Sequence, residues 1–158
     1  MLAGVLVCSA AWASPQLEME AGGGIFGHAD SSPTFTGRVG VDFWNHLTPS
    51  VRLITLSPLD SGRSAWAVLG ELRAHTNGRW QVNAGLSLGL GTATFATGTD
   101  HSPLAANLYS ASPYVMGDVG LRLMLGHFWV GVNVGGSPMP DNQYWLGTLS
   151  VGFRMFGE

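Results

Sequence analysis

Apolar and polar residues alternate regularly over long stretches of this chain. From Trp80 to Leu90 every even position is apolar, whereas the odd positions carry Gln, Asn, Gly or Ser. The same period of two runs through Phe35–Phe43, Val115–Leu125 and Trp145–Met155. Because successive side chains of a β-strand point to opposite faces, this alternation predicts strands with one apolar face.

Weaker alternation marks four more segments, namely Gln16–Phe26, Ser50–Ser57, Ala65–Arg73 and Phe128–Gly135. Turn-forming residues separate all eight segments, and Asn77-Gly78 is a typical hairpin signal. The connections alternate between short and mostly longer ones, the longest running from Thr92 to Pro113. This asymmetry predicts an all-β fold, an up-and-down antiparallel transmembrane β-barrel of eight strands with short turns at one end.

The first residues have the features of a secretory signal peptide. Leu2–Val7 is an apolar run, and Ala11-Trp12-Ala13 fits the small-x-small cleavage pattern. We expect residues 1–13 to be removed on export, residues 14–158 to form one barrel domain, and the true start to lie upstream, because no basic residue precedes the apolar run. The alternatives are a first strand or a short buried segment at this position. No later stretch is long and apolar enough for a transmembrane helix.

Charged residues are scarce in this chain. Seven Arg, no Lys and ten acidic residues make up 11% of it, against about 25% in an ordinary soluble domain. The net charge of −3 excludes a nucleic-acid-binding protein that relies on a basic surface. The single Cys excludes a disulfide framework and a Cys-based zinc site.

The polar face of the predicted strands carries five acidic residues and five Arg. They are Glu18, Glu20, Arg38, Asp42, Arg52, Glu71, Arg73, Asp118, Arg122 and Arg154. A narrow barrel interior requires such balance, because an unpaired buried charge is costly. Arg suits this pairing, since its guanidinium can bond a carboxylate through two donors. We therefore predict ion pairs inside the barrel and the apolar face outside, against lipid.

Aromatic residues gather at the two ends of the predicted strands, and aliphatic residues and Gly fill the middles. One end has Phe26, Phe35, Trp66, Tyr114, Tyr144 and Trp145. The other end has Phe43, Trp44, Trp80, Phe128, Trp129, Phe153 and Phe156. Two aromatic girdles around an aliphatic band are typical of proteins that cross a membrane, because aromatic side chains favour the membrane–water interface.

With these features the chain resembles the small eight-stranded outer-membrane barrels of Gram-negative bacteria, which include the OmpA-like transmembrane domain. The resemblance covers the signal peptide and the mature chain, and it is one of architecture rather than of a motif. It implies an outer-membrane location, contact with lipid and lipopolysaccharide, and insertion by the outer-membrane assembly machinery. Leu149–Phe156 resembles the last strand that this machinery recognises, which ends on an aromatic residue. The chain departs from that pattern because Gly157 and Glu158 follow Phe156.

An eight-stranded barrel has an interior just wide enough for side chains, so we expect a structural or surface-interaction role and not a wide porin. One alternative is a lipid A-modifying barrel enzyme. Palmitoyltransferases of this kind resemble the chain in having a loop His and an Asp-Ser pair, for which His28, Asp60 and Ser61 are the only candidates. His101–Pro103 does not match the His-x-Ser-Asn pattern of the deacylases. No flanking motif agrees, so we expect no enzyme. A second alternative is a soluble exported barrel that binds an apolar ligand, with its apolar face inward.

No metal site or cofactor is predicted. The five His lie in separate loops or turns, where we expect solvated side chains; they are His28, His46, His75, His101 and His127. No two of them have ligand spacing on one element. Each longer loop has one Asp, a common turn residue; these are Asp30, Asp60, Asp100 and Asp141. As a hypothesis, this acidic rim binds divalent cations that bridge lipopolysaccharide phosphates.

Overall fold

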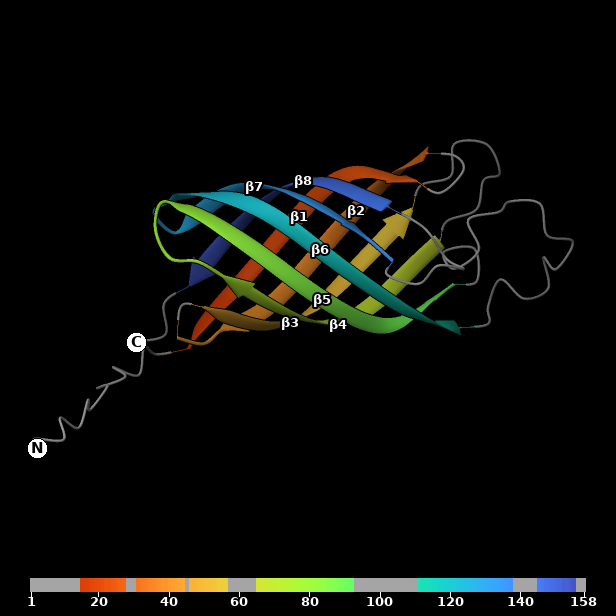
Figure 1. Ribbon diagram of the computed structural model, residues 1–158, viewed down its shortest axis with the longest axis horizontal. Helices are drawn as coiled ribbons and strands as arrows, with labels where there is room; N and C mark the ends of the chain where they lie inside the picture. The colour runs from red at the N-terminus through yellow and green to blue at the C-terminus, as the bar shows by residue number, and fades with distance from the viewer. Residues whose placement is uncertain are drawn as a thin grey trace, which may run out of the picture.

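The computed structural model describes residues 15–27, 31–44, 46–56, 65–92, 111–137 and 145–155. They form eight antiparallel strands that close into one up-and-down barrel in sequence order (Figure 1). The strands are β1 (Gln16–Gly27), β2 (Ser31–Asp42), β3 (Leu47–Leu56), β4 (Ala65–His75), β5 (Trp80–Thr92), β6 (Ala111–Leu125), β7 (Phe128–Gly136) and β8 (Trp145–Met155). The predicted all-β, eight-stranded barrel is confirmed. Among these residues there is no helix long and apolar enough to cross a membrane.

Pairing of the first and last strands closes the barrel. β1 pairs with β8 from Leu17 and Met155 at one end to Gly27 and Trp145 at the other. The first of these ends also has the tight turns between β4 and β5 and between β6 and β7, and we call it the turn end. Gly78 and Gly126 form these turns with φ angles of 120° and 73°, which favour glycine. We call the opposite end, where β1 ends and β8 begins, the loop end.

Three strands begin earlier than the sequence predicted, and each extension includes a proline. Pro33, Pro49 and Pro113 stand in β2, β3 and β6, although they were interpreted as turn residues. Among the described residues each is paired with one neighbouring strand only: Pro33 faces β1 and Pro113 faces β5. Pro49 faces β4 alone. A proline is tolerated there, because its missing N–H leaves no unpaired partner on a second strand.

The apolar face of the alternation is the outer face of the barrel. On β5, Val82, Leu86 and Leu88 are 58%, 61% and 62% exposed, whereas their neighbours Asn83 and Ser87 are buried. The other strands follow the same parity, with apolar side chains on the outer face and all the charged side chains of the strands on the inner face, beside small residues and a few buried apolar ones. The barrel therefore has an apolar wall and encloses its charges, the reverse of a soluble β-barrel.

Candidate functional site

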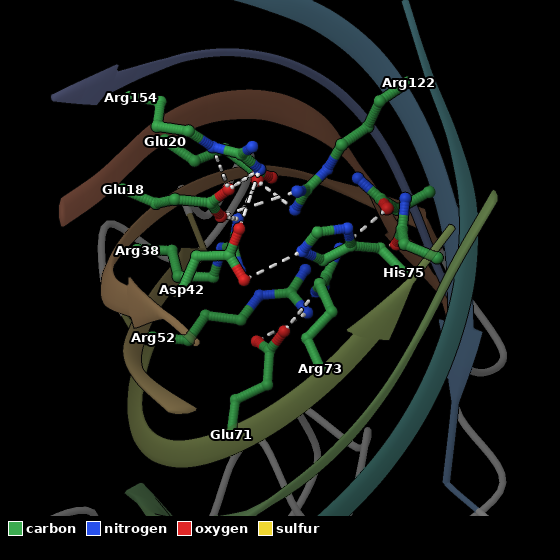
Figure 2. A network of polar contacts seen from close by, with 12 residues as sticks. Glu18, Glu20, Arg38, Asp42, Arg52, Glu71, Arg73, His75, Arg122 and Arg154 are labelled. Carbon is green, nitrogen blue, oxygen red and sulfur yellow. Dashed lines mark hydrogen bonds and ion pairs between the residues drawn. The ribbon is translucent and has the colours of Figure 1, made fainter. Parts of the chain in front are cut away.

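The ten predicted interior charges all lie on the inner face of the barrel, and Figure 2 shows nine of them. Their ion pairs form two clusters, with no ion pair between the clusters among the described residues. Their side chains are at most 9% exposed. Every second residue of a strand points inward, so strand parity alone brings these side chains into the same space. The register between strands then decides which of them meet.

The first cluster has three carboxylates and three guanidiniums. Its members are Glu18, Glu20, Arg38, Asp42, Arg122 and Arg154. Glu18 is its centre, because its two oxygens meet Arg38 Nη2 at 3.2 Å, Arg122 Nη1 at 3.5 Å and Arg154 Nη2 at 2.5 Å. Glu20 Oε2 lies 2.7 Å from Arg38 Nη2 and 3.0 Å from Arg122 Nη2. Asp42 Oδ2 lies 3.2 Å from Arg154 Nη2.

The second cluster has two carboxylates and two guanidiniums on β3, β4 and β6. Arg73 donates to Glu71 Oε1 at 2.5 Å and to Asp118 Oδ1 at 2.9 Å. Arg52 Nη1 donates to Asp118 Oδ2 at 2.7 Å and lies 3.7 Å from Glu71 Oε2. Arg73 Nη1 also donates to the side-chain oxygens of Asn83 and Asn133, at 2.7 and 3.0 Å.

Each cluster is neutral by itself. Three acidic residues balance three Arg in the first, and two balance two in the second. Local neutrality matters because a buried charge without a partner costs several kcal/mol, whereas a hydrogen-bonded pair offsets much of its own desolvation. The interior therefore holds ten charges without an excess of either sign.

His75 is the one His that the structure places inside the barrel, among the described residues. The sequence led us to expect a solvated side chain in a turn, but β4 continues through His75. The residue is 5% exposed, and its Nε2 lies 3.3 Å from Asp42 Oδ1. The prediction was wrong because the strand was ended two residues early, at Arg73. The other two described His, His46 and His127, are exposed.

Uncharged polar side chains complete the inner face and were not singled out from the sequence. Gln16, Gln81, Asn83 and Asn133 are all buried. The signal for them was present, since each stands on the polar parity of its strand. Two of them, Asn83 and Asn133, accept hydrogen bonds from Arg73 through their side-chain oxygens, and a buried guanidinium needs such partners.

The inner glycines give the long side chains room. A Cβ on Gly152 would lie 2.1 Å from ring carbons of Trp129, and a Cβ on Gly85 would lie 3.2 Å from oxygens of Asp118 and Glu71. A larger residue at either position would have to displace its neighbour. These glycines are therefore set by packing across the lumen.

Apolar side chains fill the interior toward the loop end. This buried cluster, which we call the apolar plug, consists of Phe26, Ile54, Ala67, Leu69, Tyr114, Met116 and Leu146. Its members come from β1, β3, β4, β6 and β8, so it reaches across the lumen. The sequence did not predict it, because these residues share strand parity with the polar face. The interior is thus ion-paired toward the turn end and apolar toward the loop end.

Three residues assigned to the aromatic girdles do not belong to them. Phe26, Tyr114 and Trp129 are 4%, 3% and 1% exposed and point into the barrel. All three stand on the inner parity of their strands. The Trp129 ring lies against Gly152, and the Arg122 guanidinium lies 5.0 Å from the centroid of the Trp129 ring. An arginine over an aromatic face is a favourable cation–π contact.

The remaining described aromatics lie on the outer wall or at its ends. Phe35, Trp66 and Trp145 are exposed toward the loop end, and Trp44, Trp80 and Phe128 are exposed toward the turn end. Phe43 and Phe153 are half-buried; the rings of Phe43 and Trp44 and those of Phe128 and Phe153 are in contact. Tyr144 and Phe156 lie outside the described residues.

Other predicted positions also fall outside the described residues. They are the candidate catalytic residues His28, Asp60 and Ser61, the loop residues Asp30, Asp100, His101 and Asp141, and the segment 1–13. The described part of the chain therefore brings together the ion-pair residues and His75. It does not place the candidate catalytic residues.

No protein-family model and no curated protein sequence matches this chain. Its fold is similar to the N-terminal β-barrel domain of Pseudomonas aeruginosa OprF, with a TM-score of 0.61 and 16% identity over 90% of this chain and 99% of that one. It is also similar to Neisserial surface protein A (NspA), with a TM-score of 0.60 and 12% identity over 93% and 99% of the two chains. The Yersinia pestis outer membrane protein Ail, solved in a phospholipid bilayer nanodisc, has a TM-score of 0.53 and 14% identity over 87% and 99%. At these identities the likeness shows a shared barrel fold.

Proposed function

We propose that this protein is a small outer-membrane β-barrel with a structural or surface-interaction role and a closed interior. The observation that carries the proposal is the direction of its side chains. Leu149, Leu88 and Val134 are 66%, 62% and 61% exposed, and similar aliphatic residues surround the barrel between the exposed aromatics at its two ends. A soluble protein rarely exposes an apolar patch of more than a few hundred Å². Bilayer lipid is the environment that such a wall fits.

The filled interior supports a role that does not depend on conduction. The ion-pair clusters occupy the lumen toward the turn end, and the apolar plug crosses it toward the loop end. An interior of this kind offers no wide aqueous path. The connections at the loop end would face the surroundings of the cell. Differences in function among proteins of this fold would then depend on these connections.

The remaining parts of the proposal concern export and assembly. Residues 1–13 serve as a signal peptide, and residues 14–158 enter the outer membrane with the help of the outer-membrane assembly machinery. The lipid partners are the acyl chains of phospholipid and lipopolysaccharide. Ail, an outer membrane protein solved in a phospholipid bilayer nanodisc, has a similar fold, and this likeness supports the location.

Fractionation of cells that express the full chain tests the location. We expect the protein in the outer-membrane pellet, with faster gel migration before boiling than after it, because a folded membrane barrel resists the gel detergent. Recovery in the periplasmic fraction without detergent would contradict the proposal. In planar bilayers we expect no large, stable conductance steps, and such steps would contradict a closed interior.

The soluble alternative has little support, because its ligand cavity would need the apolar face inside the barrel. A lipid A-modifying activity rests on residues beyond the described ones. Incubation of the purified barrel with lipid A and phospholipid tests it by mass spectrometry. We expect neither transfer nor release of an acyl chain, and detection of either would replace the structural role with an enzymatic one.

A further inference from the structure

A buried group of metal-ligating side chains lies at the turn end of the lumen. Glu18 of β1, Asp42 at the end of β2 and His75 at the end of β4 bring one ligand atom each to within 4.8 Å of one another. The side chains of Asp42 and His75 are fully buried, and Figure 2 shows the imidazole of His75 pointing at the Asp42 carboxylate. The residues come from three strands, so only the closed barrel assembles them.

The contact between His75 and Asp42 lacks a donor. Nδ1 of His75 lies 3.3 Å from the backbone oxygen of Thr76, which can only accept, so we assign the proton of the neutral ring to Nδ1. Nε2 of the neutral ring then carries a lone pair, and it points at another acceptor, Asp42 Oδ1. Neither atom has a hydrogen-bond partner in the described structure. Two buried acceptors that face each other need a cation between them.

The spacing of the two acceptors is that of two ligands on one metal ion, and it is longer than a charge-assisted hydrogen bond. Nε2 and Oδ1 are 3.3 Å apart, whereas a hydrogen bond between an imidazolium and a carboxylate has its heavy atoms about 2.7–2.9 Å apart. Ligands about 2.0–2.1 Å from a tetrahedral zinc ion are separated by about 3.3–3.4 Å. A hydrogen bond from Nδ1 to a backbone carbonyl is also the usual way in which a metal-bound His is oriented.

We propose that His75 Nε2 and Asp42 Oδ1 form a binding site for a divalent transition-metal ion of the Zn²⁺ class. An imidazole nitrogen with carboxylate oxygens suits zinc, whereas Mg²⁺ and Ca²⁺ prefer ligand sets made of oxygen alone. Glu18 is the third protein ligand, and water completes the tetrahedron. The site closes one end of the ion-pair network and ties β2 to β4 across the lumen.

Arg154 is the natural competitor of the metal ion. Its Nη2 atom bridges Glu18 Oε1 at 2.5 Å and Asp42 Oδ2 at 3.2 Å, and so the two carboxylates share its single positive charge. With a side chain that is 9% exposed, Arg154 is the most accessible residue of the two clusters. Metal binding displaces its guanidinium from Glu18 Oε1, while Glu18 Oε2 keeps its contacts with Arg38 and Arg122. Without Arg154 the cluster has one excess negative charge, and this attracts a divalent ion.

Zinc binding by the purified, chelator-treated barrel in detergent tests the proposal by isothermal titration calorimetry. We expect one Zn²⁺ per chain at this site, with Mg²⁺ unable to replace it. His75→Gln should weaken zinc binding by about tenfold or more. The matched control is His127→Gln, which removes an exposed His from the turn between β6 and β7 at the same end and should leave the affinity unchanged.

Arg154→Gln should change zinc affinity in the opposite sense to His75→Gln, because loss of the competing guanidinium should tighten zinc binding. The difference in gel mobility before and after boiling verifies that each variant is folded. Equal zinc binding by the wild type and His75→Gln would overturn the proposal, as would no binding by the wild type or weaker binding by folded Arg154→Gln. A dependence of this kind on both His75 and Arg154 is not expected of zinc held by surface His.

Discussion

Replacement of Arg73 by Met tests whether the interior charges are balanced cluster by cluster. Arg73 binds both carboxylates of its cluster, Glu71 and Asp118, and donates to Asn83 and Asn133. Met fills a similar volume without charge. The variant leaves Arg52 as the only cation beside two buried carboxylates. Loss of one partner from a buried ion pair costs about 3–5 kcal/mol. We therefore expect the free energy of unfolding to fall by about 3–5 kcal/mol.

A second substitution in the same cluster should restore part of this loss. Glu71→Gln returns the cluster to one acid and one Arg, so Arg73→Met/Glu71→Gln should be about 1–3 kcal/mol more stable than Arg73→Met alone, a normal coupling energy between residues in contact. The control is Arg73→Met/Glu18→Gln. It has the same net charge as the rescued variant, but it leaves both clusters unbalanced, so its two losses should add.

Urea unfolding in phospholipid vesicles measures these differences, with tryptophan fluorescence as the signal because the chain has six Trp. The mobility shift on unboiled gels reports the folded fraction independently. Equal rescue by Glu71→Gln and Glu18→Gln would show that only total charge matters and would refute the division into two clusters. Lower stability of Arg73→Met/Glu71→Gln than of Arg73→Met would refute local balance altogether.

Two further substitutions test the wall and the packing of the lumen. Leu88→Arg, in the middle of the outer face of β5, should lower the free energy of unfolding in vesicles by about 2–4 kcal/mol. Trp80→Arg, at the end of the same strand, should add a cost of about 0–1 kcal/mol for placing Arg near the membrane interface. Equal losses would contradict the depth assigned to β5. Gly152→Val should cost about 1–3 kcal/mol, since its side chain meets the Trp129 ring, and Trp129→Ala should recover part of that loss in the double variant. Additive losses in the same unfolding assay would contradict this contact.

Strand parity made most of the fold predictable from the sequence. Regular alternation in segments such as Trp80–Leu90 fixes both the strand and the face of each residue, and the eight segments all became strands. The strand ends were less predictable, because proline usually marks a turn. Pro49 is accommodated because the β2–β3 ladder ends at Ser50, and strand lengths around a barrel cannot be inferred from one strand at a time.

The ion-pair partners could not be predicted, although their residues could. Arg52 meets Asp118 across the lumen, 66 positions away in the sequence. That contact depends on the register of every strand between them, and composition does not encode register. The same limit applies to His75, whose role beside Asp42 becomes visible only when β2 and β4 are placed in one barrel.

Aromatic residues show a different limit. Position near a strand end suggested an interfacial role for Tyr114 and Trp129, but parity places both inside. Parity decides because it follows from backbone geometry, whereas the preference of aromatic side chains for a membrane interface is a weaker, statistical tendency. The apolar plug was missed for a related reason. In the sequence each of its residues is an isolated exception on the polar face of one strand, and only the closed barrel brings them together.

The most direct test of an apolar wall in lipid is the accessibility of spin labels along the outer face of β5. Single Cys variants at Val82, Ala84, Leu86 and Leu88, labelled and reconstituted in phospholipid vesicles, are compared by electron paramagnetic resonance for collision with oxygen and with a water-soluble nickel chelate. A bilayer around the barrel predicts frequent oxygen collisions and few nickel collisions, with the greatest contrast at the middle positions. Frequent nickel collisions at all four positions would contradict it, because they would place the wall in water.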